Sequence, residues 1–250
     1  MKILIFVMLF MILSSIGRTQ NTVDEQFNTW ITYAGDHAVS KRIDIHTLYS
    51  FRRNEFMKNW QQSLLRVGLG NKLTDKIKVQ VGYDWIVTFP YGKQPISFQT
   101  NEHRVWAHLN LKFQEQRFYF SNRIRFENRA IEALHAGDQN ERVVDGFNWK
   151  FRLRYKFAVD VPLNNNRLDE STLFLSLSDE LFMNLFEKNK YFNQNWFYAG
   201  LGWKFVKGIK LKIGYMNQFL PKTDGVHVEN NHTLSLSYIQ NFSFTKNNNQ

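Results

Sequence analysis

The sequence predicts an all-β fold, a transmembrane antiparallel up-and-down β-barrel of about 10–12 strands. The clearest sign is residues 149–157, where aromatic and aliphatic side chains alternate strictly with Lys and Arg. A period of two places these two kinds of side chain on opposite faces of a strand. Composition agrees, because aromatic residues form 16% of the chain while its mean hydropathy is only −0.43. An apolar outside around a wet inside gives this combination.

The N-terminus has the features of a secretory signal peptide, which we place at residues 1–20 with cleavage near residues 17–20. Lys2 supplies the positive start, and the apolar run of residues 3–13 is too short to span a bilayer. An N-terminal anchor helix is the alternative, which the short run disfavours. Export together with amphipathic strands predicts that residues 21–250 form a single barrel domain in a bacterial outer membrane, in contact with its lipid.

Charge and cysteine content exclude several other classes. The chain of 250 residues has a formal net charge of +10 and contains no Cys. Disulfides and thiolate metal sites are therefore excluded. The His residues are scattered and the loop carboxylates lack a ligand spacing, so no metal or other cofactor is expected. Lys and Arg alternate with aromatic residues instead of clustering in a tail or helix, so nucleic acid is not an expected partner.

The first four expected strands follow the signal peptide. Residues 27–34 are a short aromatic strand, and residues 42–52 place isoleucine and aromatic side chains on one face. Residues 60–70 and 77–89 form an expected hairpin through the polar turn at residues 71–75. In the fourth strand every odd-numbered residue is apolar and most even-numbered residues are polar, which predicts one wet face.

The middle of the chain carries the most charged strands. Residues 102–113 and 117–129 are joined by a tight connection, and each alternates apolar residues with charged ones. Residues 130–146 are expected to be a long polar loop before the strand at residues 149–157. Pro162 and the asparagines that follow it predict a turn or loop.

The last four strands alternate in the same way. In residues 173–183 leucine alternates with serine and glutamate, and residues 196–205 and 209–219 form a hairpin around a Lys-Gly turn. Residues 221–231 are expected to be a loop and residues 233–244 the final strand. This makes eleven strands, whereas single-chain bacterial barrels have even numbers. Either the short first strand lies outside the wall or the pattern hides one more strand.

Connection lengths predict the orientation, because outer-membrane barrels have short periplasmic turns and longer outer loops. The connections near Asn71, Glu115 and Lys207 are short, and most of those that alternate with them are longer. The chain therefore ends on the periplasmic side. The connection near Asn165 fits less well, since it is long yet falls on that side. The lysines expected in a solvated basic rim near the periplasmic turns are Lys76, Lys78, Lys112, Lys204, Lys210 and Lys212.

Charged side chains on the inward faces are the main candidate for a functional site. The expected lumen charge cluster consists of Asp84, Glu102, Arg104, Arg123, Arg125, Glu127, Arg129, Arg152, Arg154 and Glu180. One interpretation, which we favour, is an ion-pair network that fills a narrow barrel. The other is an anion-selective constriction or ligand site, because rings of Arg and Lys favour anions.

The hairpin that carries most of these charges has a predicted register. Pairing Arg104 with Glu127 sets opposite charges across the two strands, and the same register pairs Glu102 with Arg129. A shift by two residues sets Arg104 opposite Arg125 and is disfavoured because like charges repel. A slip by one residue is excluded, since it would turn one strand's charges to the apolar face.

An enzyme would need a nucleophile beside a base. The candidate side chains are His103, His108 and His232 as bases and Ser121, Ser235 and Ser237 as nucleophiles. Barrel lipases need such a pair on the outer face, and no tight His-x-Ser spacing occurs on an outward face here. We therefore expect no catalysis, and a lipid-modifying enzyme is the most remote hypothesis.

Four motifs stand out along the chain. They are Glu102-His103-Arg104-Val105-Trp106, the run Arg123-x-Arg125-x-Glu127-x-Arg129, Glu180 after an alternating strand, and Gly214-Tyr215. Together they resemble the domain-of-unknown-function 2490 family over residues 27–244. The resemblance implies an outer-membrane β-barrel without an established activity. The aromatic end of the last strand is also similar to the assembly signal of outer-membrane proteins, which implies the barrel-assembly machinery as a partner during insertion.

The sequence thus predicts an outer-membrane barrel whose specific role stays open. A small-solute or anion-preferring pore with an Arg- and Glu-lined lumen competes with a plugged structural barrel that transports nothing.

Overall fold

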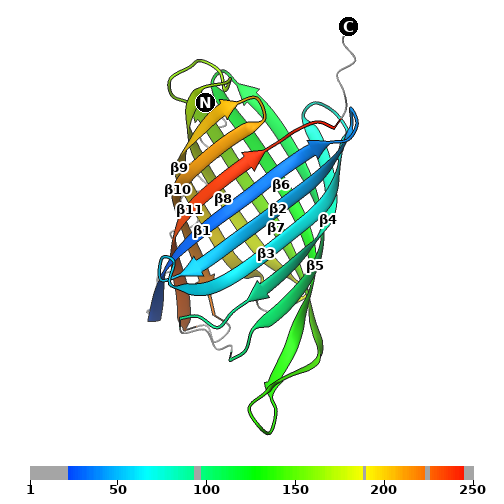
Figure 1. Ribbon diagram of the computed structural model, residues 1–250, viewed down its shortest axis with the longest axis vertical. Helices are drawn as coiled ribbons and strands as arrows, with labels where there is room; N and C mark the ends of the chain where they lie inside the picture. Colours follow the sequence, from blue (N-terminus) through cyan, green and yellow to red (C-terminus); the bar gives the residue numbers. More distant parts are fainter. Residues whose placement is uncertain (1–21, 93–96, 188–189, 223–225, 245–250) are drawn as a thin grey trace.

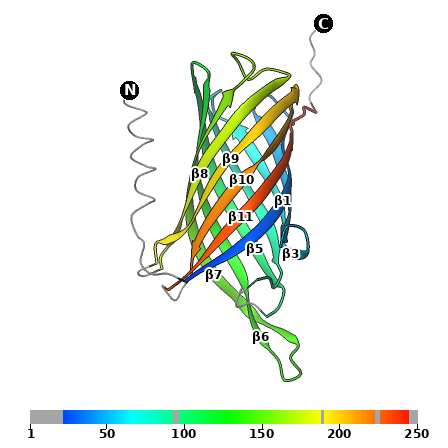
Figure 2. The ribbon, with the colours of Figure 1, turned by 90° about the vertical axis from the view of Figure 1, so that its left-hand side faces the viewer.

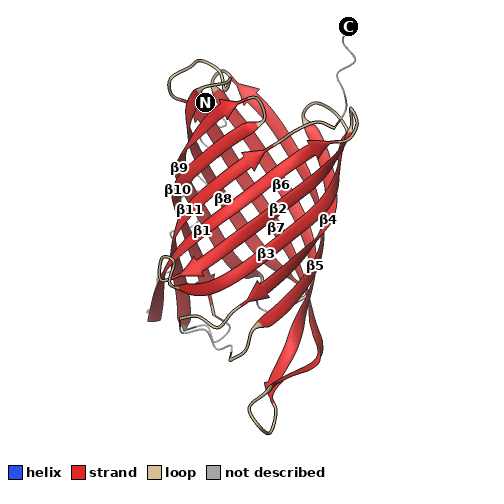
Figure 3. Ribbon diagram, in the orientation of Figure 1, coloured by secondary structure: helices blue, strands red, loops and turns tan. Residues whose placement is uncertain are grey.

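The computed structural model describes residues 22–92, 97–187, 190–222 and 226–244 (Figure 1). These residues form eleven β-strands that close into one barrel, which confirms the predicted fold class (Figure 3). In chain order the strands are β1 (Thr22–Ala38), β2 (Ile43–Asn54), β3 (Asn59–Lys72), β4 (Ile77–Thr88), β5 (Thr100–Glu115), β6 (Phe118–Ala136), β7 (Arg142–Pro162), β8 (Thr172–Leu185), β9 (Phe192–Val206), β10 (Ile209–Pro221) and β11 (His227–Gln240). No helix among the described residues is long and apolar enough to cross a membrane. The predicted signal peptide at residues 1–20 lies outside the described residues.

The barrel is an up-and-down meander that closes with a parallel seam. Consecutive strands pair antiparallel from β1 to β11. β1 and β11 then lie side by side and pair in parallel, from Thr22 opposite His227 to Ala34 opposite Ile239 (Figure 1). An odd number of strands requires one such pair, because every antiparallel step reverses the strand direction. The first strand therefore belongs to the wall, and the expectation that it lies outside or that a strand is hidden is wrong.

The two ends of the barrel differ in their connections. At the hairpin end, the β6–β7 hairpin extends beyond the rim of the barrel, as Figure 2 shows. The connections from β2, β4, β8 and β10 to the next strand also lie at this end. The C-terminal end carries the turns after β1, β3, β5 and β9, the connection at residues 163–171, and the end of β11. Connections therefore alternate between the two ends as predicted.

Residues 130–146 are mostly strand, so the prediction of a long polar loop is wrong. β6 continues to Ala136 and β7 begins at Arg142, with Leu134 opposite Val144 beyond a bulge. The two strands continue to satisfy each other's backbone groups after neighbouring strands have ended, which a two-stranded ribbon can do. Only residues 137–141 connect them.

The last strand also begins earlier than predicted. Residues 227–231, expected to be loop, pair with β10 and with β1 at the same time. β11 ends at Gln240, and Phe242 beyond it stacks on His37 with ring centroids 3.9 Å apart. Pairing on both sides, more than apolar alternation, sets where this polar segment becomes a strand.

Alternation along the strands separates an apolar outer surface from a polar lumen. Large outward side chains that stay exposed include Leu65, Val67, Leu69, Val81, Val105, Ile124, Trp149, Leu201, Ile213 and Leu234. Soluble monomers rarely expose contiguous apolar patches larger than a few hundred Å². The wall therefore has the apolar-out, polar-in alternation that is typical of membrane barrels.

Glycines in the wall make room for aromatic side chains in the lumen. Gly68 lies opposite Gly82, which in turn lies opposite Trp106. A Cβ at Gly82 would come within 2.5 Å of the Trp106 ring and 2.3 Å of a backbone carbonyl oxygen. Phe174 covers Gly202 in the same way, 2.1 Å from the position of a Cβ. These rings fill part of the interior beside the charged side chains.

Candidate functional site

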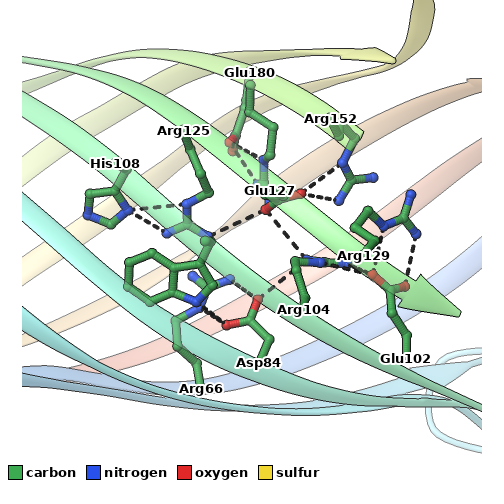
Figure 4. Close-up of polar contacts among 12 residues, drawn as sticks. Arg66, Asp84, Glu102, Arg104, His108, Arg125, Glu127, Arg129, Arg152 and Glu180 are labelled. Carbon is green, nitrogen blue, oxygen red and sulfur yellow. Dashed lines mark hydrogen bonds and ion pairs between the residues drawn. The ribbon is translucent and has the colours of Figure 1, made fainter. Parts of the chain in front are cut away.

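The inward charges of β4 to β8 meet in the barrel interior (Figure 4). The structure brings together all ten residues expected there and adds Arg66 from β3. This lumen charge network consists of Arg66, Asp84, Glu102, Arg104, Arg123, Arg125, Glu127, Arg129, Arg152, Arg154 and Glu180. It contains seven arginines and four carboxylates, so it carries a formal charge of +3.

Asp84 links β3, β4 and β5. Its two oxygens accept hydrogen bonds from Arg66 Nε and Nη2, both at 2.7 Å, in the bidentate geometry that Arg favours. Trp106 Nε1 donates to the same carboxylate at 2.6 Å, and Arg104 Nη1 lies 3.4 Å away. A fully buried carboxylate is tolerated here because three donors replace the water it has lost.

Glu102 lies between Arg104 and Arg129. Arg129 donates to it from Nε at 2.7 Å and from Nη2 at 2.9 Å. Arg104 donates to one of the same oxygens from Nε at 2.9 Å and from Nη2 at 2.7 Å. One carboxylate thereby holds two guanidinium groups in place.

This arrangement follows from a register that differs from the predicted one. Arg104 lies directly opposite Arg129, and Glu127 lies opposite Trp106, so the predicted pair of Arg104 with Glu127 is wrong. The hairpin closes on a two-residue turn in which Gln116 has a φ of 53°, a conformation typical of tight hairpins. The turn sets the register, and this register places Arg104 opposite Arg129. Glu102 compensates these two like charges.

Glu127 is the centre of the network. It accepts hydrogen bonds from Arg152 Nε at 2.8 Å and Nη2 at 2.6 Å, and from Arg154 Nη1 at 2.9 Å. Arg104 and Arg125 lie 3.6 and 3.7 Å from its Oε1. Four positive charges surround a carboxylate that is completely buried, and this is what keeps it ionised in the interior.

Glu180 extends the network to β8. Arg123 Nη2 donates to it at 2.6 Å, and Arg154 donates from Nε at 2.8 Å. Because Arg154 also donates to Glu127, the ion pairs form one continuous chain from β3 to β8.

Arg125 is held differently. Its Nη2 lies 2.9 Å from His108 Nδ1, and the other ring nitrogen of His108 lies 2.7 Å from Gln80 Oε1. With Nδ1 accepting and Nε2 donating, His108 is a neutral bridge between the arginine and the amide. Arg125 Nη1 is buried and has no hydrogen-bond partner among the described residues.

Three lumen residues were not expected from the sequence as part of this site, namely Arg52, Arg66 and His108. Arg52 makes no ion pair with the described residues; it donates to Gln62 at 2.6 Å and lies 3.7 Å from the ring of Trp30. The alternation of residues 42–52 and 60–70 predicts that Arg52 and Arg66 point inward, because both occupy even-numbered positions on the inward face.

A cavity of about 730 Å³ occupies the lumen and is lined by residues from all eleven strands. Thirteen Lys and Arg side chains line it, against three carboxylates, Asp36, Glu102 and Glu180. The wall of β1, β2 and β11, which the strand order places across the barrel from β6, contributes small side chains such as Ser50 and Ser235. Space therefore remains between the charge network and the facing wall.

At the hairpin end, Tyr91 lines the cavity just after β4. Its hydroxyl donates to Glu229 Oε1 at 3.2 Å, and Lys222 pairs with the other oxygen of Glu229. Burial and the neighbouring carboxylate raise the pKa of Tyr91, so the phenol stays a neutral donor.

The histidines considered as bases have other partners. The rings of His103 and His232 face outward, where each bonds a tyrosine, Tyr83 at 2.5 Å and Tyr215 at 2.6 Å. Within the described residues, no histidine is hydrogen-bonded to a candidate serine. In the same part of the chain no group of three metal-ligating side chains occurs. The absence of catalysis stays a prediction.

Comparison with known proteins points to one family. The family model described as a protein of unknown function, DUF2490, matches residues 27–229. No curated protein and no solved structure matches the chain.

Proposed function

The chain belongs to the DUF2490 family, and we propose that it is an outer-membrane barrel whose lumen passes small anionic solutes. The main support for the proposal is the composition of the cavity lining, which contains thirteen cationic side chains and three carboxylates.

The location rests on the outer surface of the barrel. Residues such as Val67, Val105 and Leu201 expose about half or more of their surface. In water an apolar belt of this kind promotes association, whereas in a bilayer it lies against lipid at no such penalty. The predicted signal peptide supports export to the outer membrane.

Selectivity rests on fixed positive charge in a confined passage. Low-dielectric walls focus the field of the arginines, which concentrates anions and repels cations. The ion pairs neutralise part of this charge, but Arg52 has no carboxylate partner among the described residues and lines the cavity. We therefore expect the charge of Arg52 to attract a passing anion more strongly than the charges of the paired arginines do.

The size of the solute is limited by the network itself. Trp106 and Glu127 are almost fully buried, so side chains close-pack the side of the lumen that holds the charge network. A solute that passes must fit the cavity of about 730 Å³ that remains beside the network. If packing closed the passage altogether, the barrel would be the plugged structural protein that the sequence also allows.

Flux through proteoliposomes tests the proposal. We expect chloride efflux from vesicles that contain the folded barrel, and slower efflux with Arg52→Gln. Arg53→Gln is the matched control, because it removes the same charge from the adjacent, outward-facing position and should leave efflux unchanged. Folded barrels that release no small anion would establish the plugged alternative.

A further inference from the structure

We propose that the lumen contains a binding site for a phosphate-like oxyanion near the C-terminal end of the cavity. Its side chains are Lys112 of β5, Arg123 of β6, Lys156 of β7, Tyr198 of β9 and Lys212 of β10, and all five line the cavity. We call this set the oxyanion site. It goes beyond the proposed passage of anions, because it binds whether or not the barrel conducts.

The first argument is uncompensated charge. The ammonium groups of Lys112 and Lys156 form no hydrogen bond or ion pair with any described residue. Glu180 attracts the Lys156 ammonium while Arg123 and Lys212 repel it. Glu180 compensates Lys156 only in part, because its Oε1 also accepts hydrogen bonds from Arg123 at 2.6 Å and from Arg154 at 2.8 Å. Like charges brought together in a narrow lumen favour the binding of a counter-ion, since screening by water is weaker there than in bulk.

The second argument is a pair of buried donors that lack an acceptor. Tyr198 Oη and Arg123 Nε have no hydrogen-bond partner among the described residues. The Tyr198 hydroxyl is held over Gly200 and Gly214, where a Cβ would lie 2.4 and 2.7 Å from it. Lys212 Nζ lies 5.2 Å from the centre of the Tyr198 ring, so an ammonium group lies over the ring that carries this hydroxyl. Buried donors without partners are rare in native proteins, and here both donors belong to residues that line the same cavity.

The third argument is the balance of charge at the site. Four cations, Lys112, Arg123, Lys156 and Lys212, stand against two carboxylates. Glu180 pairs with Arg123, and Asp160 lies 3.9 Å from Lys212. Because Glu180 is also shared with Arg154, the site keeps an excess of positive charge, which is the sign that a phosphate group requires.

The geometry of the donors separates such a group from a simple halide. A tetrahedral oxyanion offers several acceptor oxygens, so it can receive hydrogen bonds from a hydroxyl, a guanidinium and three ammonium groups at once. Chloride offers a single charge to the same donors. We therefore expect the site to prefer phosphate over chloride at equal ionic strength.

Isothermal titration calorimetry of the detergent-folded full chain tests this directly, with inorganic phosphate as the probe and ionic strength held constant. We expect binding that weakens at least about tenfold in Lys156→Gln and in Lys212→Gln, because each loses a charge-assisted contact. Tyr198→Phe should weaken it by a smaller factor, since it loses a neutral donor. Lys207→Gln, in the exposed turn at the same end, should bind as the unsubstituted protein does. Glycerol phosphate as a second titrant distinguishes phosphate esters from free phosphate as the source of the group.

Two results would overturn the proposal. One is equal affinity for phosphate and chloride, and the other is an equal loss of binding in Lys156→Gln and Lys207→Gln. Neither depends on transport, so a barrel that binds phosphate but releases no anion from vesicles would refute the pore and leave the oxyanion site standing.

Discussion

Replacing Glu127 by glutamine tests the lumen charge network at its centre. The substitution keeps the shape of the side chain and removes its charge. Three hydrogen bonds from Arg152 and Arg154, between 2.6 and 2.9 Å, then lose their anionic acceptor. Arg104 and Arg125, within 3.7 Å, lose the nearest compensating charge as well.

The expected loss of stability is large for a single isosteric change. Removing one partner of a buried ion pair costs about 3–5 kcal/mol, because the other partner stays buried and unpaired. The cavity beside the network gives Arg152 and Arg154 access to water, and both line it. We therefore expect a value near the lower limit, about 3 kcal/mol.

Urea unfolding of the barrel in lipid vesicles measures this value, with the fluorescence of the seven tryptophans as the signal. Asp138→Asn is the control, because Asp138 is exposed in the β6–β7 turn and forms no ion pair among the described residues. A Glu127→Gln variant that unfolds within about 0.5 kcal/mol of the unsubstituted protein would show that the arginines do not depend on this carboxylate.

Three further predictions concern the wall. Leu234→Arg should destabilise the barrel by about 2–4 kcal/mol, while Ser235→Arg, whose side chain enters the cavity, should change little; the reverse order in vesicle unfolding would invert the assigned faces. Cysteines at Val105 and Asn128 should form a disulfide, because these outward residues lie directly opposite each other and the chain has no other cysteine. Cysteines at Val105 and Phe126 should not form one, and a disulfide in this second pair alone would support the register predicted from charge. Gly82→Ala should cost about 1–3 kcal/mol, because its Cβ would meet Trp106 and a backbone oxygen, and unchanged unfolding would mean that the indole is not confined there.

Local alternation contains most of the information about the wall. Every expected strand overlaps an observed one, and the inward parity of Arg104, Arg125, Glu127 and Arg152 follows from the period of two. The same parity contains Arg52 and Arg66, which the choice of the most charged strands left out. The position of the charge network can thus largely be predicted from the sequence.

The register and order of strand pairing cannot be predicted from the sequence in the same way. The register of β5 with β6 depends on the turn conformation at Gln116, and weighing charges alone selects the wrong neighbours. The parallel seam joins β1 to β11 across the whole length of the chain, so no local pattern encodes it. The extension of the β6–β7 hairpin likewise rests on backbone pairing, which polar residues do not prevent.

The reversal potential of single barrels in a planar bilayer, measured under a potassium chloride gradient, tests the central claim most directly. A lumen lined by thirteen cations and three carboxylates predicts discrete conductance steps and a reversal potential on the chloride side. Substituting Arg52 by glutamine should move that potential toward zero. A cation-selective reversal potential, or folded barrels that insert and stay silent, would contradict the account.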